Sequence, residues 1–302
     1  MAGFTAWMGR NYRALQSAAS LPMVMVLLVV VALLTVAKLQ HETLELSVGW
    51  MALIGPACVI VALGLFRLRR LLWHWGFWAV LALTSLAHIY RDWPGPANHT
   101  YAFLYLCLIM VLVMLNQQQE RASLLQSNTR WLFAAIMLLA VLQKVITPGY
   151  LDGSINAFWL ATGGYGKPLY AQSEAWQEVV QHNYALLDHY FNQTPYAVQA
   201  IEFRAPVSNL RFWGQMVSAG ILLGEVVVPL VFLFARNALV KHLSLLLFVA
   251  GVFFIRQETG FLSLLCILGL AQIPDGKSGW RLAYLGVIAV MQTLFLLGYG
   301  YI

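Results

Sequence analysis

WLFAAIMLLAVLQKVIT, residues Trp131–Thr147, is a stretch of 17 residues with one charged side chain, Lys144, near its end. An apolar run of about 17–25 residues is long enough to cross a bilayer as a helix, so the stretch predicts a membrane span. An ionisable side chain inside a span is a functional candidate by default. The structural alternative is a lysine that extends its amine to the lipid headgroups from three residues inside the span end. The sequence leaves both readings of Lys144 open.

The whole chain has the same apolar character as this stretch. Of its 302 residues, 61% are hydrophobic and 10% are charged, and the mean hydropathy is +0.72. A soluble domain carries roughly 25% charged residues, so the composition predicts an integral membrane protein. The densest basic cluster, Arg67-Leu68-Arg69-Arg70, flanks a span and fits a topology determinant, not a nucleic-acid surface. Cys58, Cys107 and Cys266 lie in apolar runs without CxxC spacing, which argues against a disulfide framework and a zinc site.

Apolar runs that suit membrane spans recur along the chain. The nine predicted spans are Leu21–Leu39, Val48–Phe66, Leu71–Tyr90, Tyr101–Leu115, Trp131–Thr147, Phe212–Ala235, Val240–Ile255, Gly260–Ile273 and Leu282–Ile302. The fourth, seventh and eighth are short, so they extend into polar flanks, tilt differently or form a re-entrant pair. The predicted fold is all-α, a polytopic transmembrane helix bundle of about nine spans, with eight and ten as alternatives. It forms a single membrane domain over residues 1–302.

Loop charges predict how the bundle is oriented. With the N-terminus in the cytoplasm, eleven Lys and Arg residues fall on the cytoplasmic side and seven on the other side, which also holds the longest loop. Cytoplasmic loops carry the excess of Lys and Arg in membrane proteins. We therefore expect a cytoplasmic N-terminus and an outer C-terminus, in a membrane such as the bacterial inner membrane.

The long outer loop, residues 148–209, contains one predicted amphipathic helix over residues 173–192. Ser173 is a suitable N-cap, and Glu174 places an acid in the first turn, where the helix dipole favours it. Apolar residues recur at helical spacing and make one face: Trp176, Val179, Val180, Tyr184, Leu187 and Phe191. Such a helix lies on the membrane surface or over the mouth of the bundle. It serves as a fixed cap or as a moving lid, and the cap is the simpler reading.

This helix does not predict a metal site. Glu178 and His182 are four residues apart and face the same way, but His189 lies roughly 10 Å farther along the axis than His182. A catalytic zinc usually has three protein ligands, and the helix has no HExxH pattern. His182 and Trp159, both in the outer loop, remain candidates for substrate contact.

Glu225 and His88 are two further ionisable candidates inside predicted spans. Glu225 is near the middle of Phe212–Ala235, one turn before Pro229, and a carboxyl at that depth must be protonated, paired or facing water. Its structural alternative is a neutral acid that is hydrogen-bonded to a neighbouring helix. A pair with Lys144 forms if the two residues lie at matching depths. His88 lies at the same outer side as Lys144 and completes the candidates for catalysis.

Two stretches of the chain resemble a known family. LFAAIMLLAVLQKVITPGYLDGS, from Leu132, resembles the lysine-bearing span of the vitamin K-dependent gamma-glutamyl carboxylase family and of the wider horizontally transferred transmembrane family. In those proteins the lysine is followed by an aromatic residue and an acidic-Gly step, here Tyr150 and Asp152-Gly153. EVVVPLVFLFAR, from Glu225 to Arg236, is similar to the family's acid, proline and arginine pattern.

The resemblance implies a quinone-type cofactor and acid–base chemistry. In the carboxylases a lysine amine held neutral in the membrane deprotonates reduced vitamin K, and reaction with oxygen then gives a strong base that allows glutamate to be carboxylated. Lys144 stands where that lysine would be, with Tyr150 and Asp152 as implied substrate contacts. The chain departs from the family in two respects. LLLFVAGVFFIRQETGF, which follows the arginine, has no histidine, and no counterpart of the large lumenal domain is expected, so glutamate carboxylation is not predicted.

The sequence thus predicts a membrane-embedded protein that resembles the membrane core of these enzymes and acts on a quinol, a lipid or a peptide at the outer face. The alternative is a non-catalytic subunit or maturation factor of a larger membrane complex, for which abundant Trp and Tyr suit interfacial anchoring. A transporter is disfavoured because no broken-helix repeat is recognisable. Whether the chain is an enzyme stays open, and its expected partners are membrane lipids and other membrane subunits.

Overall fold

The computed structural model describes residues 24, 25, 27, 29, 69–91, 98–166, 170–192, 202–274 and 278–296, and these residues form helices without strands. The chain divides into two compact units. Unit 1 comprises residues 1–136, 231–249 and 258–302, and unit 2 comprises residues 137–230 and 250–257. Three long helices contribute residues to both units: α7 (Arg121–Ile146), α11 (Leu210–Phe234) and α12 (Ala238–Arg256).

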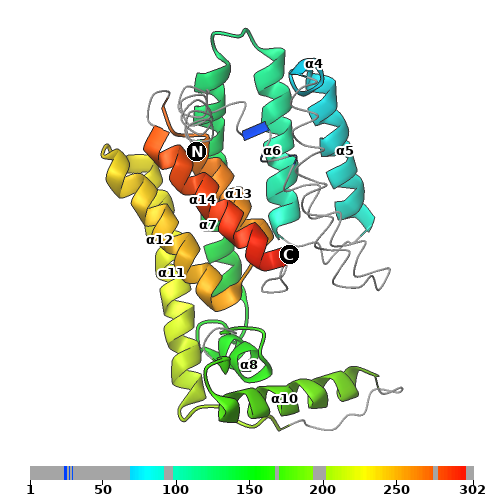
Figure 1. The fold of residues 1–302 in the computed structure, drawn as a ribbon, viewed down its shortest axis with the longest axis vertical. Helices are drawn as coiled ribbons and strands as arrows, with labels where there is room; N and C mark the ends of the chain where they lie inside the picture. The colour runs from blue at the N-terminus through cyan, green and yellow to red at the C-terminus, as the bar shows by residue number, and fades with distance from the viewer. Residues whose placement is uncertain are drawn as a thin grey trace, which may run out of the picture. The chain divides into compact units, whose positions relative to one another are not determined.

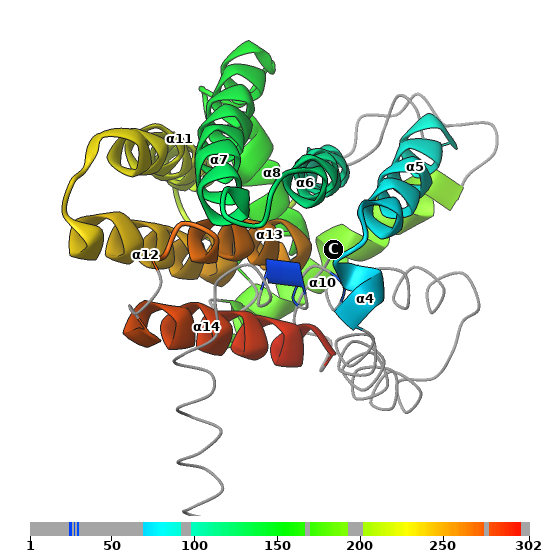
Figure 2. The same ribbon diagram turned by 90° about the horizontal axis from the view of Figure 1, so that it is seen from above.

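In unit 1 a short helix lies at the centre of the packing. Helix α13 (Thr259–Leu270) packs against α6 (Asn98–Leu115) and against α14 (Ser278–Leu296), beside which it lies in both views (Figures 1 and 2). Nearly all of its 12 residues are buried. Twelve residues extend only about 18 Å as a helix, too short for a hydrocarbon core of about 30 Å. Helix α13 is therefore a core helix, shielded by its neighbours.

The first described helices of unit 1 form a hairpin. Helix α4 (Arg69–Leu72) leads into α5 (Trp75–Arg91), and α5 packs along α6. The indole of Trp78 is fully buried and donates from Nε1 to the carbonyl of Leu72 at 2.8 Å, so the bend between α4 and α5 is held by a hydrogen bond.

Three helices of the described residues, α7, α11 and α12, are long and apolar enough to cross a membrane. Many of their large apolar side chains are exposed, as expected of helices whose outer surface faces lipid. These exposed residues are Trp131, Leu138, Leu139, Leu142, Val145 and Ile146 on α7; Phe212, Trp213, Met216, Leu223, Val227, Leu230 and Phe234 on α11; and Leu239, Val240, Leu243, Leu247 and Phe254 on α12. The composition and these three helices together indicate a membrane protein.

The described residues show an all-helical fold with helices that could span a membrane, but they do not show nine membrane spans. Seven of the nine predicted ranges overlap helices of the described part of the chain, but α6 and α13 are shorter apolar helices, and among the described helices only α7, α11 and α12 meet the length and hydropathy of a span. The ranges Leu21–Leu39 and Val48–Phe66 lie outside the described residues, apart from residues 24, 25, 27 and 29. Helix α7 also begins ten residues before the predicted start at Trp131. The predicted orientation of the termini stays a prediction.

Unit 2 contains the end of α7, the shorter helices α8 (Ser154–Thr162) and α10 (Glu174–Asn192), and most of α11. Helix α10 covers the residues for which the sequence predicts a helix, and the Trp176 N–H donates to the Ser173 hydroxyl at 3.4 Å, as expected of an N-cap. Helix α10 packs against α8, with Val180 buried against Gly163. One face of the amphipathic helix is therefore covered by α8.

Candidate functional site

Lys144 and Glu225 form an ion pair inside unit 2. The Lys144 Nζ donates to Glu225 Oε1 at 2.7 Å, although the two residues are 81 positions apart in the chain. The Glu225 side chain is 4% exposed and the Lys144 side chain 14%. Removing a charge from water costs several kcal/mol per ion in real proteins. Each of these two charges is therefore tolerated in its position because the other is present.

The local structure explains how each residue is positioned. Lys144 lies in the last turn of α7, where the carbonyl end of the helix dipole favours a cation. Glu225 lies on α11 four residues before Pro229, which is inside the same helix. Proline has no N–H, so α11 cannot donate the usual helical hydrogen bond to the carbonyl of Glu225.

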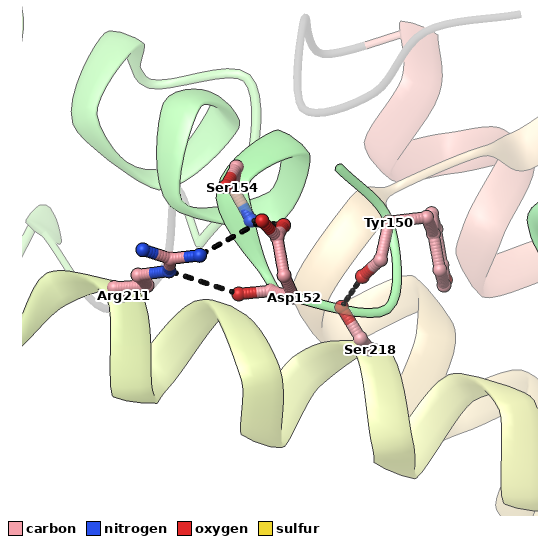
Figure 3. A network of polar contacts seen from close by, with 5 residues as sticks. All are labelled: Tyr150, Asp152, Ser154, Arg211 and Ser218. Carbon is pink, nitrogen blue, oxygen red and sulfur yellow. Dashed lines mark hydrogen bonds and ion pairs between the residues drawn. The ribbon is translucent and has the colours of Figure 1, made fainter. Parts of the chain in front are cut away.

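The loop that follows α7 is fastened to α11 at two points (Figure 3). The carbonyl of Tyr150 accepts a hydrogen bond from the Ser218 hydroxyl at 2.7 Å. The carboxylate of Asp152 accepts one from Arg211 Nη2 at 2.8 Å, and Arg211 Nε donates to the Asp152 carbonyl at 3.3 Å. Ser218 and Arg211 both lie on α11. Because Glu225 also lies on α11, these contacts fix the position of Tyr150 relative to Glu225.

Two glycines allow the start of α8 to approach α11 closely. Gly153 is the N-cap of α8 and has a φ of 78°, a left-handed conformation that glycine adopts without strain. A Cβ on Gly214 would meet the carbonyl oxygen of Gly153, and it would lie 2.8 Å from the amide nitrogen of Ala157. Beside this contact the Asn156 Nδ2 donates to the Ser218 hydroxyl at 2.6 Å. The loop, α8 and α11 thus form one tightly packed body around Ser218.

Tyr150 lies next to the ion pair. Tyr150 is 5% exposed, and the centroid of its ring is 6.0 Å from Lys144 Nζ. Burial raises the pKa of Tyr150, the Glu225 carboxylate and Tyr165 raise it further, and Asn156 and Arg256 act in the opposite direction. The hydroxyl therefore remains a protonated hydrogen-bond donor at neutral pH. Lys144, Tyr150, Asn156, Ser218 and Glu225 are called the Lys144 cluster below.

The Asp152 carboxylate lies on the exposed side of the loop. The Ser154 N–H donates to its Oδ1 at 3.0 Å. Hydrogen bonds from Ser154 lower the pKa of Asp152 most, and Arg211 lowers it further. The Asp152 side chain is about half exposed, so its role is to hold the loop by local contacts.

Asp152 is expected to make the stability of the folded protein depend on pH in acidic solution. Because the pKa of Asp152 is lower in the folded protein than the ordinary value of 3.8, its stabilising contribution is complete above about pH 4 and is lost as the pH falls through the lower, folded pKa. In Asp152→Asn, the melting temperature should decrease less than in the wild type as the pH is lowered from about 6 to about 3. Asp188→Asn on the exposed face of α10 is the control. A profile of Asp152→Asn that falls as steeply as the wild type would contradict the assignment.

The remaining sequence-predicted site residues lie outside the Lys144 cluster. His88 belongs to α5 in unit 1, where its Nδ1 is 3.3 Å from Arg91 Nη2. Trp159 is on α8, 40% exposed, with its ring centroid 6.0 Å from that of Tyr165. His182 is half-buried on α10. Of the predicted residues, the structure brings together Lys144, Glu225 and Tyr150, with Asp152 on the same loop.

Three buried polar residues of unit 2 were not predicted from the sequence as site residues. Asn183 is fully buried on α10, where it donates to the carbonyls of Ala161 and Arg204 at 2.9 and 2.8 Å and accepts from the Arg204 N–H at 2.9 Å. Asn156 and Ser218 are buried as well. A buried amide or hydroxyl must find hydrogen-bond partners, but the sequence does not show that these three side chains are buried.

A buried histidine was also missed. The stretch LLLFVAGVFFIRQETGF has no histidine, but α12 begins at Ala238 and contains His242 just before that stretch. His242 is 2% exposed, and its Nδ1 lies 3.2 Å from the Tyr284 hydroxyl. Its ring centroid is 5.4 Å from that of Trp280. The expectation that this span lacks a histidine is therefore wrong for the helix as a whole, and the histidine belongs to the core of unit 1.

Within the described part of the chain, no group of three His, Cys, Asp or Glu residues is arranged to hold a metal ion. Comparison of the chain with protein-family models, with curated proteins and with solved structures found no match.

Proposed function

We propose that the chain is a membrane-embedded acid–base enzyme, with Lys144 as the proton acceptor and an amphiphilic hydroxyl compound of the quinol type as substrate. The observation that carries the proposal is the Lys144–Glu225 ion pair, with its Nζ–Oε1 distance of 2.7 Å and its near-complete burial. Titratable groups held in such an environment are typical of sites that transfer protons. The site lies at the end of α7, where the chain leaves an apolar helix for a polar loop.

The resemblance to the carboxylase family is supported by the way its two stretches meet. One stretch contributes Lys144 and Tyr150 and the other contributes Glu225, and these three side chains lie together although the stretches are far apart in the chain. We therefore carry over acid–base chemistry on a quinol, and not glutamate carboxylation.

The proposed step needs only these side chains and the substrate. In the ion pair Lys144 is an ammonium, so the step begins when it passes one proton to Glu225, which leaves a neutral amine and a neutral acid. The Lys144 amine then accepts the proton of a substrate hydroxyl, so that an O–H bond breaks and an N–H bond forms. The products are a substrate oxyanion and the Lys144 ammonium, which stabilise each other. Burial strengthens this interaction because little water screens it. Proton transfer in the reverse direction restores the amine.

The test follows the ionisation of a bound quinol. The protein is placed in lipid nanodiscs without oxygen, and a naphthoquinol with a short alkyl chain is titrated while its absorbance reports neutral quinol and quinolate. We expect saturable binding and quinolate formation at a pH at which free quinol is neutral. Lys144→Arg should bind without forming quinolate, because a guanidinium does not give up its proton. Lys144→Met combined with Glu225→Leu should also form none.

Lys241→Met is the matched control, because Lys241 lies on α12 in unit 1 and not in the Lys144 cluster. It should leave both binding and quinolate formation unchanged. Absence of saturable binding to the wild type, or quinolate formation in the Lys144→Arg variant, would refute the proposed function.

A further inference from the structure

Two cations of unit 1, Arg130 and Lys241, lie near each other without an acidic partner among the described residues. Arg130 is on α7, and Phe133, one turn later, packs against Phe232 of α11 with ring centroids 4.6 Å apart. Lys241 Nζ lies 6.0 Å from the centroid of the same Phe232 ring. Arg130 and Lys241 are close enough for the positive charge of one to act on the other. Phe232 thus connects the parts of α7 and α12 that carry the two cations.

The described residues do not neutralise this pair of cations. Neither side chain forms an ion pair or a hydrogen bond with another described residue, and Arg130 Nε is inaccessible to solvent without an acceptor. The described carboxylates of unit 1 are Glu120 and Glu258. Glu120 lies ten residues before Arg130, about 15 Å along the axis of α7. Glu258 lies beyond the far end of α12, which is about 22 Å from Lys241 along the helix.

Three features make this arrangement unfavourable unless an anion is bound. Neighbouring like charges repel each other, and the repulsion is stronger where burial reduces screening by water. Lys241 lies in the first turn of α12, where the positive end of the helix dipole disfavours a cation. The buried Nε–H of Arg130 lacks an acceptor, which costs the free energy of a missing hydrogen bond. A bound anion would offset the repulsion and supply acceptors.

The two cations also lie where apolar helices end. Arg130 directly precedes the apolar run Trp131–Thr147. Phe232 is in the last turn of α11, and Lys241 is in the first turn of α12. The ends of membrane-spanning helices lie at the depth of the lipid headgroups. Large apolar side chains next to these positions in the chain are exposed: Trp131, Phe234, Leu239 and Val240. These surroundings suit a ligand with an anionic head and apolar chains.

We infer that Arg130 and Lys241 bind the phosphate of an anionic phospholipid, whose acyl chains lie against the exposed apolar side chains of α7 and α12. A guanidinium donates to phosphate oxygens in a planar fork, and an ammonium adds a compact charge. Basic sites between transmembrane helices bind anionic headgroups in this way. A zwitterionic phospholipid carries its own cation, so it neutralises the two side chains less well. A soluble phosphate has no chains to cover the apolar side chains.

The experiment measures lipid binding to the full chain, purified in detergent and stripped of lipid, by native mass spectrometry during a titration. The ligands are dioleoylphosphatidylglycerol, dioleoylphosphatidylcholine and glycerol phosphate, which represent an anionic lipid, a zwitterionic lipid and a soluble phosphate. We expect one phosphatidylglycerol molecule to bind about tenfold more tightly than phosphatidylcholine. An excess of glycerol phosphate should not displace it. Arg130→Gln and Lys241→Gln should each weaken phosphatidylglycerol binding by about fivefold.

Arg236→Gln is the matched control, because Arg236 is an exposed cation in the segment between α11 and α12 and is not one of the pair. It removes the same charge and should leave the lipid affinity unchanged. A second measurement, the melting temperature without lipid, distinguishes binding from folding. Arg130→Gln and Lys241→Gln should then melt at the same temperature as the wild type or higher, because each relieves the repulsion between the two cations.

Several outcomes would overturn the inference. Equal affinity of the wild type for the two phospholipids, or unchanged phosphatidylglycerol affinity in both variants, would leave the two cations as determinants of membrane topology. Equal weakening by Arg236→Gln would indicate a general attraction between loop charges and lipid. Displacement by glycerol phosphate would identify a soluble anion as the ligand, and a lower melting temperature of the lipid-free variants would assign the cations to folding. None of these readouts depends on ionisation of a quinol at Lys144.

Discussion

Replacing Lys144 with methionine is expected to lower the free energy of unfolding by about 3–5 kcal/mol, the usual cost of leaving one partner of a buried ion pair behind. The variant leaves the Glu225 carboxylate, 4% exposed, without the ammonium that lies 2.7 Å away in the wild type. Methionine fills a similar volume and has no charge, so the loss arises mainly from Glu225. The measurement is unfolding of the protein in mixed micelles with increasing denaturing detergent, followed by circular dichroism.

The double variant, Lys144→Met with Glu225→Leu, provides the control. Replacing both partners of a buried ion pair with apolar residues is often neutral or stabilising, so the double variant should regain most of the stability that Lys144→Met loses. It should still form no quinolate. A double variant that is less stable than Lys144→Met would show that the two side chains are not coupled as the 2.7 Å contact indicates.

Gly214→Ala is expected to destabilise the protein by about 1–3 kcal/mol through overpacking. The added Cβ would meet the Gly153 carbonyl oxygen and lie 2.8 Å from the Ala157 amide nitrogen, and both are backbone atoms that cannot turn aside as a flexible side chain can. The start of α8 would have to move away from α11, which would weaken the hydrogen bonds around Ser218. Hydrogen exchange of residues 153–162 should therefore become faster, together with the loss of stability in the same detergent titration.

Gly220→Ala is the matched control on the same helix. A Cβ on Gly220 would meet nothing within 4 Å, and alanine favours a helix over glycine by about 1 kcal/mol. This variant should be as stable as the wild type or more stable. If the two substitutions have equal effects, the close approach of α8 to α11 does not contribute to stability.

Local features of this protein were predictable from its sequence. Residues 173–192 show a cap and an apolar face that depend only on residues a few positions apart, and the structure has a helix over Glu174–Asn192. The long apolar helices α7, α11 and α12 follow from uninterrupted apolar runs in the same way. Lys144 and Glu225 could be recognised singly, because each is a charge inside an apolar run.

Contacts between residues that are far apart in the chain could not be predicted in this way. The pairing of Lys144 with Glu225 was an open alternative, since it depends on the depth at which α7 and α11 face each other. Ser218 and Asn156 have no unusual sequence context, and their role arises from the close approach that Gly153 and Gly214 allow. The sequence of α13 resembled a short membrane span, because an apolar composition fits a helix surrounded by protein as well as a helix surrounded by lipid.

The contacts of α11 in unit 2 have a further consequence for its electrostatics. Arg211, Ser218 and Glu225 follow one another at intervals of seven residues, which is about two helical turns, so they form a row along one face that is about 21 Å long. At one end the Arg211 and Asp152 side chains are 67% and 47% exposed, and at the other end Lys144 and Glu225 are 14% and 4% exposed. Dissolved salt screens exposed charges far more than buried ones. Ionic strength therefore weakens the attachment of the loop while leaving the Lys144–Glu225 pair almost unaffected.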